Sequence, residues 1–108
     1  MLLMVKLFHW KTHSFSTHKA TDELYATLNE HMDKFIETLL GENENRIDLM
    51  NRKTISLIDL NSTSALKKKV EQFKRYLTNI TLLSSDLLNI RDEILGDMNK
   101  FLYLLTLK

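Results

Sequence analysis

The absence of proline restricts the fold of this chain most, because proline interrupts helices and none of the 108 residues is a proline. Only Gly41 and Gly96 break long stretches that are rich in leucine, lysine, glutamate and methionine, which favour helix. The 44% apolar and 27% charged residues match an ordinary globular domain. We therefore predict a single all-α domain over residues 1–108.

The charge balance and the start of the chain point away from a membrane partner. Fifteen basic and 14 acidic side chains give a net charge of +1, too little for a general attraction to nucleic acid or anionic lipid. The apolar opening "MLLMVKLF" is interrupted by Lys6 and followed by polar residues, so it is too short for a signal peptide or a membrane span. We expect a cytoplasmic protein. Because cysteine is absent, any metal site must consist of histidine, aspartate and glutamate.

Apolar residues recur at intervals of three and four and predict four helices. The first expected helix runs from Leu2 to Thr12, and the second from a cap at Ser16 or Thr17 to Leu40, with Gly41 as the C-cap. The third runs from Ala65 to Thr81, after a cap within Ser62 to Ser64. The fourth runs from a cap at Ser84 or Ser85 to Leu107. The expected buried stripes are Leu3, Leu7 and Trp10 with Met4 and Phe8 beside them; Leu24, Leu28, Met32, Phe35 and Leu39; Leu66, Val70, Phe73 and Leu77; and the apolar residues of the last segment from Leu87 to Leu105.

A polar connection of two dozen residues, Gly41 to Ser64, separates the second helix from the third. Its length suits a crossover from one end of a bundle to the other, with a short extra helix at Ile47 to Met50 or Ile55 to Leu60. Four helices with one long crossover between the second and third form a ferritin-like four-helix bundle. The first helix would span ~17 Å against ~36 Å for the second. Either residues before Met1 have been lost or another subunit covers the remaining length.

Four potential metal ligands border the buried stripe of the second helix. With ~100° per residue and His18 at zero, Asp22 lies at ~40°, Asp33 at ~60° and Glu37 at ~100°. Asp22 and Asp33 are ~16 Å apart along the axis, whereas a pair of bridged metal ions is ~4 Å across. His18 and Asp22 therefore cannot share a metal with Asp33 and Glu37 of the same chain.

An antiparallel copy of this helix across a two-fold axis would place His18 and Asp22 of one subunit opposite Asp33 and Glu37 of the other. His9, on the first helix, would complete the site beside Asp33 and Glu37. The alternative is an ordinary solvated helix surface, with Lys19, Glu23, Glu30 and Lys34 as ion-pair partners. His13 and His31 do not fall into the register of the other ligands and are interpreted as surface or interface residues.

These residues resemble the pattern of the Dps mini-ferritins, the iron-oxidising DNA-protection proteins of starved cells. The matching motifs are "HW", "H-x3-D-x-L-Y" and "M-D-x3-E", together with a last segment "DLLNIRDEILGDMNKFLYLL" similar to the family's final helix. His18, Asp22, Asp33 and Glu37 reproduce the family's ligand spacings of four, eleven and four. Nine residues separate His9 from His18, where the family usually has twelve. The chain also resembles uncharacterised proteins encoded by large DNA viruses, which would place it in the host cytoplasm.

The resemblance implies an iron-binding ferroxidase whose catalytic and metal ligands are His9, His18, Asp22, Asp33 and Glu37. Fe(II) would be oxidised with hydrogen peroxide as the preferred oxidant, or with oxygen, and stored as a ferric mineral inside a shell of twelve subunits. Trp10, next to a ligand, would be either an electron donor or part of the core.

Two hypotheses from other classes remain. The first is a helical homo-oligomeric scaffold that keeps the fold without oxidising iron, consistent with the short first helix. The second is a DNA-associated protein, for which "LKKKVEQFKRY" supplies the cations Lys67, Lys68, Lys69, Lys74 and Arg75. Binding of this kind would weaken steeply with salt.

Overall fold

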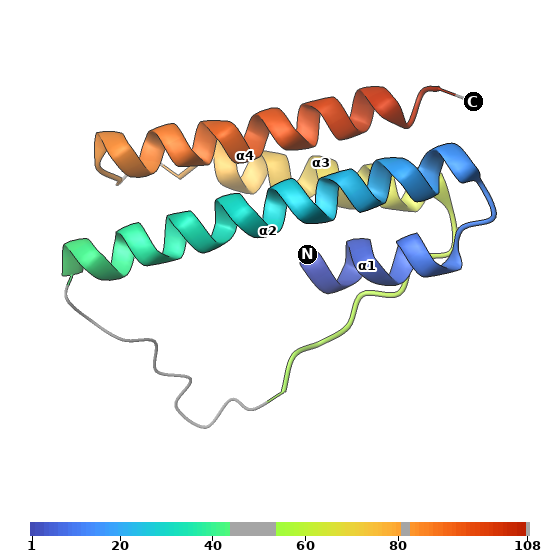
Figure 1. Cartoon of the computed structure of the whole chain (residues 1–108), viewed down its shortest axis with the longest axis horizontal. Helices are drawn as coiled ribbons and strands as arrows, with labels where there is room; N and C mark the ends of the chain where they lie inside the picture. The colour runs from blue at the N-terminus through green and yellow to red at the C-terminus, as the bar shows by residue number, and fades with distance from the viewer. Residues whose placement is uncertain (44–53, 81–82, 108) are drawn as a thin grey trace.

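The computed structural model describes residues 1–43, 54–80 and 83–107 and contains four α-helices and no strand within them (Figure 1). The helices are α1 (Leu2–Lys11), α2 (Phe15–Asn43), α3 (Thr63–Thr78) and α4 (Ser85–Leu104). The prediction of an all-α chain with four helices is thus confirmed. No helix in these ranges is both long and apolar enough to cross a membrane.

The helices lie side by side with α2 and α4 at the centre. α2 contacts α1 on one side and α4 on another, and α4 also contacts α3. α1 and α4 run in one direction, while α2 and α3 run in the other (Figure 1). α1 has 10 residues and α2 has 29, so α1 accompanies only the first half of α2, and no other described helix lies beside the second half on that side (Figure 1).

The start of α2 lies two or three residues earlier than predicted. The helix begins at Phe15, and the hydroxyl of Ser14 accepts a hydrogen bond from the main-chain N–H of Thr17 at 3.3 Å. Ser14 is therefore the capping residue, not Ser16 or Thr17. A hydroxyl at any of these three positions can cap a helix, and the sequence alone does not distinguish them.

The predicted end of α2 at Gly41 is wrong, because the helix continues to Asn43 and Gly41 does not adopt a left-handed conformation. Glycine is tolerated inside a helix at a cost of about 1 kcal/mol, and no proline follows to force an end. The predicted helix at Ile55 to Leu60 is also wrong, since these residues are not helical. The alternative at Ile47 to Met50 lies outside the described residues.

The N-cap positions of the last two helices confirm the prediction, but both helices end about three residues early. Ser62 accepts a hydrogen bond from the N–H of Ala65 at 3.1 Å, whereas Ser84 occupies the N-cap position of α4 and its hydroxyl donates to Glu42 and Asp86 instead of capping the helix. Arg91 of α4 donates to the main-chain carbonyls of Leu77 and Ile80 at 3.4 and 2.9 Å. A cation beside the carbonyls at the C-terminal end of α3 stabilises that end of the helix.

The core contains apolar residues from every helix, and α1 presents a different stripe from the predicted one. Leu3 and Trp10 are exposed, Trp10 to 70%, whereas Val5 and His9 are buried. Seven of the ten residues of α1 are apolar and they lie on several sides of the helix, so periodicity does not define its buried face. The buried apolar residues in the core cluster are Met4, Val5, Phe8, Ala20, Leu24, Leu28, Leu66, Val70, Ile90, Ile94, Met98 and Phe101.

Leu28 lies at the centre of α2 and has no exposed surface. Replacing it with alanine is expected to lower the free energy of unfolding by about 2–5 kcal/mol, because the change removes buried methyl groups and leaves a cavity. Urea denaturation followed by circular dichroism measures this loss. Leu57→Ala is the matched control: Leu57 is exposed, and its replacement is expected to change stability by no more than about 0.5 kcal/mol. Equal effects of the two changes would contradict the core described above.

Candidate metal site

Four of the predicted ligands lie on one exposed face of α2. The side chains of His18, Asp22, Asp33 and Glu37 are all exposed, and the helix that carries them is continuous from Phe15 to Asn43. None of the three carboxylates forms a hydrogen bond or an ion pair with another described residue, although Lys19 and Lys34 belong to the same helix. Unpaired carboxylates on a common face are able to bind an external cation.

The face contains two separate pairs of ligands. His18 and Asp22 are one helical turn apart, as are Asp33 and Glu37, but Asp22 and Asp33 are ~16 Å apart along the axis. Within residues 1–43, 54–80 and 83–107 of one chain, no three histidine, aspartate or glutamate side chains come close enough to hold a metal ion. Each pair therefore needs further ligands from elsewhere.

His9 joins the first of these pairs. The short turn between α1 and α2 brings the end of one helix against the start of the other, and the rings of His9 and His18 stack with centroids 3.8 Å apart and planes inclined by 21°. His9 is 8% exposed. In a single chain His9 thus lies beside His18, so it would meet Asp33 and Glu37 only if those belonged to another subunit. The shortened turn still places the two imidazoles together.

Hydrogen bonds fix both rings through the same nitrogen. Nδ1 of His9 lies 2.8 Å from the main-chain carbonyl of His18, and Nδ1 of His18 lies 3.0 Å from that of His9. A carbonyl oxygen only accepts hydrogen bonds, so each Nδ1 carries the proton. In a neutral imidazole this leaves the lone pair on Nε2, which is the nitrogen then available to a metal.

Sequence reasoning missed Thr21, which also contacts this pair. Its side chain is fully buried, and its hydroxyl lies 3.1 Å from Nδ1 of His9. Thr21 occupies a position in the apolar stripe of α2, between the buried Ala20 and Leu24. The sequence does contain a signal for this contact: Thr21 is a hydroxyl residue at a core position, three residues after the candidate ligand His18. Buried hydroxyls normally have a hydrogen-bond partner.

Lys6 connects the aromatic residues beside the histidines. Its ammonium lies 5.8 Å from the ring centre of Trp10 and 4.6 Å from that of Tyr25, both within the range of cation–π attraction. Trp10 is adjacent to His9 in sequence, and Tyr25 follows Asp22 by less than one turn. The exposed face at this end of α2 is therefore partly aromatic.

His31 is separate from the candidate ligands and links two helices of the same chain. Its ring bridges α2 and α4, with Nδ1 bonded to Asp97 and Nε2 3.4 Å from Glu93. His13 is exposed. With opposite edges of the His31 ring facing the two carboxylates, this cluster is an interhelical link and not a convergent set of ligands.

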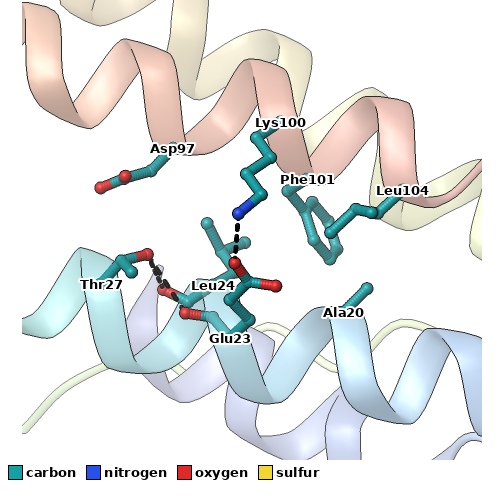
Figure 2. Close-up of a pocket in the computed structure, with 8 residues that line it drawn as sticks. All are labelled: Ala20, Glu23, Leu24, Thr27, Asp97, Lys100, Phe101 and Leu104. Atoms are coloured by element: carbon teal, nitrogen blue, oxygen red, sulfur yellow. Dashed lines mark hydrogen bonds and ion pairs between the residues drawn. The ribbon is translucent and has the colours of Figure 1, made fainter.

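A cleft between α2 and α4 is a further polar feature near this region (Figure 2). Lys100 reaches across it to Glu23, and this hydrogen bond, together with the charge of the carboxylate, raises the pKa of Lys100. The cavity has a volume of about 60 Å³, far below the several hundred Å³ of typical ligand pockets. This cleft is therefore too small for an ordinary ligand, whereas a groove of about 500 Å³ between the start of α2 and the end of α4 is lined by Asp22 itself.

The chain belongs to a family of unknown function, DUF5856, whose model matches residues 9–105. The match includes all five candidate ligands from His9 to Glu37. Neither a curated protein nor a solved structure matches the sequence.

Proposed function

We propose that this protein is a mini-ferritin-like iron protein that binds Fe(II), oxidises it with hydrogen peroxide or oxygen, and stores it in ferric form. The proposed sites are di-iron sites, each built between two subunits of a ferritin-like bundle. The observation that carries the proposal is the arrangement of two pairs of ligands on one face of α2, whose carboxylates bond to no other described residue, with two stacked imidazoles at one end.

The two pairs have the symmetry that a shared site needs. His18 and Glu37 lie equally far from the peptide bond between Thr27 and Leu28, and so do Asp22 and Asp33. An antiparallel copy of α2 centred at that point would bring both pairs together at the same time, producing two identical sites. Each would take His9, His18 and Asp22 from one chain and Asp33 and Glu37 from its partner.

The same face is suited to close approach of a second helix near that centre. Ala26 and Asn29, at ~80° and ~20° from His18, are small and exposed. Ile36 is also exposed on this face, at the same angle as His18. Small side chains at a crossing point permit the distance of roughly 8–10 Å between helix axes that packed helices adopt. The apolar Ile36 would be covered in such a dimer.

The donor set fits iron. Imidazole nitrogen and carboxylate oxygen both bind Fe(II), and carboxylates stabilise Fe(III) further through their charge, which favours oxidation at the site. α2 also carries more acidic than basic side chains, with Asp22, Glu23, Glu30, Asp33, Glu37 and Glu42 against Lys19 and Lys34. This excess of negative charge would attract the cation to the face.

The proposed reaction balances with peroxide as the oxidant. Each of two Fe(II) ions loses one electron, and hydrogen peroxide accepts both as its O–O bond breaks, giving two Fe(III) and two hydroxide ions. Holding two iron ions together allows a transfer of two electrons and avoids release of a hydroxyl radical. The role of this chain is to supply the five ligands and to hold the imidazoles in a fixed orientation.

The helix arrangement is consistent with the proposed bundle. α2 and α3 run in the same direction (Figure 1), as a long crossover between the second and third helices requires. Because α1 leaves the second half of α2 uncovered, a partner subunit would bury surface there. Exposed apolar residues elsewhere, such as Phe15, Tyr76 and Tyr103, offer contacts for a larger shell of twelve subunits.

Anaerobic titration with Fe(II), followed by peroxide, tests the proposal. We expect binding at micromolar iron, with two ions per chain in the dimer, and a rapid rise of ferric absorbance after peroxide is added. Absence of binding at micromolar iron would reject the ferroxidase. It would favour a scaffold that does not bind iron, for which the exposed Trp10 and Phe15 are the supporting observation because they would be buried on self-association.

A further inference from the structure

We infer that Thr21 is a positioning residue that holds His9 in the orientation and tautomer in which Nε2 faces the metal. This inference rests on the proposed iron site. Thr21 is fully buried, and its hydroxyl oxygen lies 3.1 Å from Nδ1 of His9. It does not reach the exposed face of α2, so its action on a metal is through His9.

The hydrogen bonds of Thr21 leave its hydroxyl as an acceptor for His9. The oxygen lies 2.8 Å from the main-chain carbonyl of Thr17 and 3.0 Å from that of His18. Since carbonyls only accept, the single hydroxyl proton is directed to them, and the lone pairs of the oxygen face His9. Nδ1 of His9 therefore meets two acceptors, the Thr21 hydroxyl and the His18 carbonyl, and carries the proton.

The arrangement also couples the two histidines. The ring of His18 is bonded to the carbonyl of His9 and stacked on the ring of His9. A rotation of the His9 ring would break its bonds to Thr21 and His18 and disturb the stack. The hydroxyl of Thr21 is the only side-chain partner of His9 Nδ1 among the described residues, which makes it the one contact that a conservative substitution can remove.

The presence of threonine at this position has no other evident explanation in the described residues. Position 21 lies in the apolar stripe of α2, where valine would fill the same volume without the cost of burying a hydroxyl. The hydroxyl becomes favourable there because it bonds both to its own helix and to His9. Partners of this kind orient a metal-binding histidine, and their loss typically weakens metal binding by about 10- to 100-fold.

Thr21→Val and Thr21→Ser test this role. In the metal-free protein, nitrogen-15 NMR of the imidazoles reports which nitrogen carries the proton. We expect His9 of the wild type in the Nδ1–H form, a measurably larger share of the Nε2–H form in Thr21→Val, where the His18 carbonyl is the one acceptor left to Nδ1 among the described residues, and recovery of the wild-type spectrum in Thr21→Ser. Fe(II) binding is expected to weaken about tenfold or more in Thr21→Val and to stay near wild type in Thr21→Ser.

Two results would overturn the inference. One is a wild-type spectrum in which His9 carries its proton on Nε2, because this result alone would show that Thr21 does not hold the Nδ1–H form. The other is a Thr21→Val variant with the wild-type helix content, tautomer and iron affinity. If the wild type binds no iron, the proposed function fails by itself, while the NMR comparison still decides whether Thr21 positions His9.

Discussion

If the proposed iron-binding dimer forms, replacement of Ala26 by arginine is expected to convert it into monomers and to abolish iron binding. Ala26 lies on the exposed face of α2, close to the point about which both ligand pairs are centred. In an antiparallel dimer the two introduced arginines would meet near the two-fold axis, where like charges and excess volume oppose association by several kcal/mol. Since 1.4 kcal/mol is a factor of ten, the dissociation constant should rise at least about a hundredfold.

The folded subunit should survive this change. Ala26 is exposed in the single chain, and arginine is a good helix former, so helix content and unfolding should match the wild type. Gln72→Arg provides the control, because Gln72 is exposed on α3, away from α2. Sedimentation velocity and an iron titration on the same samples measure the effect. A variant at position 26 that sediments as a dimer and binds iron normally would place the interface elsewhere.

Asp22→Ala and Asp33→Ala are each expected to reduce the initial rate of peroxide-driven iron oxidation by about a hundredfold or more. Loss of an outer partner of a metal ligand already lowers affinity or activity by up to about a hundredfold, and each of these changes would remove a direct ligand from both sites of the proposed dimer. The folded chain should be unaffected, because neither carboxylate bonds to another described residue. Stopped-flow ferric absorbance gives the rate.

Glu30→Ala is the matched control for these two variants. Glu30 is an exposed carboxylate of the same helix and lies between Asp22 and Asp33, at ~120° from His18 and outside the proposed ligand set. Its removal lowers the negative charge of α2 by the same amount. A similar loss of rate in Glu30→Ala would show that general charge, and not coordination, attracts the iron.

The helices of this chain were predictable because their signals are local. Lack of proline, apolar spacing and serine caps define α3 and α4 to within a few residues. The errors arose where competing residues are equivalent: Ser14 instead of Ser16 or Thr17 at the start of α2, and a helix that continues through Gly41. For α1, apolar residues on several sides of the helix conceal which side faces the core, so the sequence places Trp10 in the buried stripe although it is exposed.

The candidate site was predictable only as a pattern along one helix. The spacing of Asp22, Asp33 and Glu37 gives their common face, since helix geometry depends on sequence position alone. The stacking of His9 on His18 depends on how tightly the turn between α1 and α2 closes, which spacing does not determine. Thr21 was missed for a related reason, because its partner is on another helix.

A mixture of the two inactive variants tests the shared site most directly. When Asp22→Ala and Asp33→Ala chains are unfolded together in equal amounts and refolded, about half of the dimers should contain one chain of each kind. In such a dimer one site has both aspartates and the other has neither. Because half of the dimers then have one intact site of two, we expect oxidation to return to about a quarter of the wild-type rate in the mixture, while each variant refolded alone stays inactive. A mixture that stays as inactive as its components would contradict a site built from two chains.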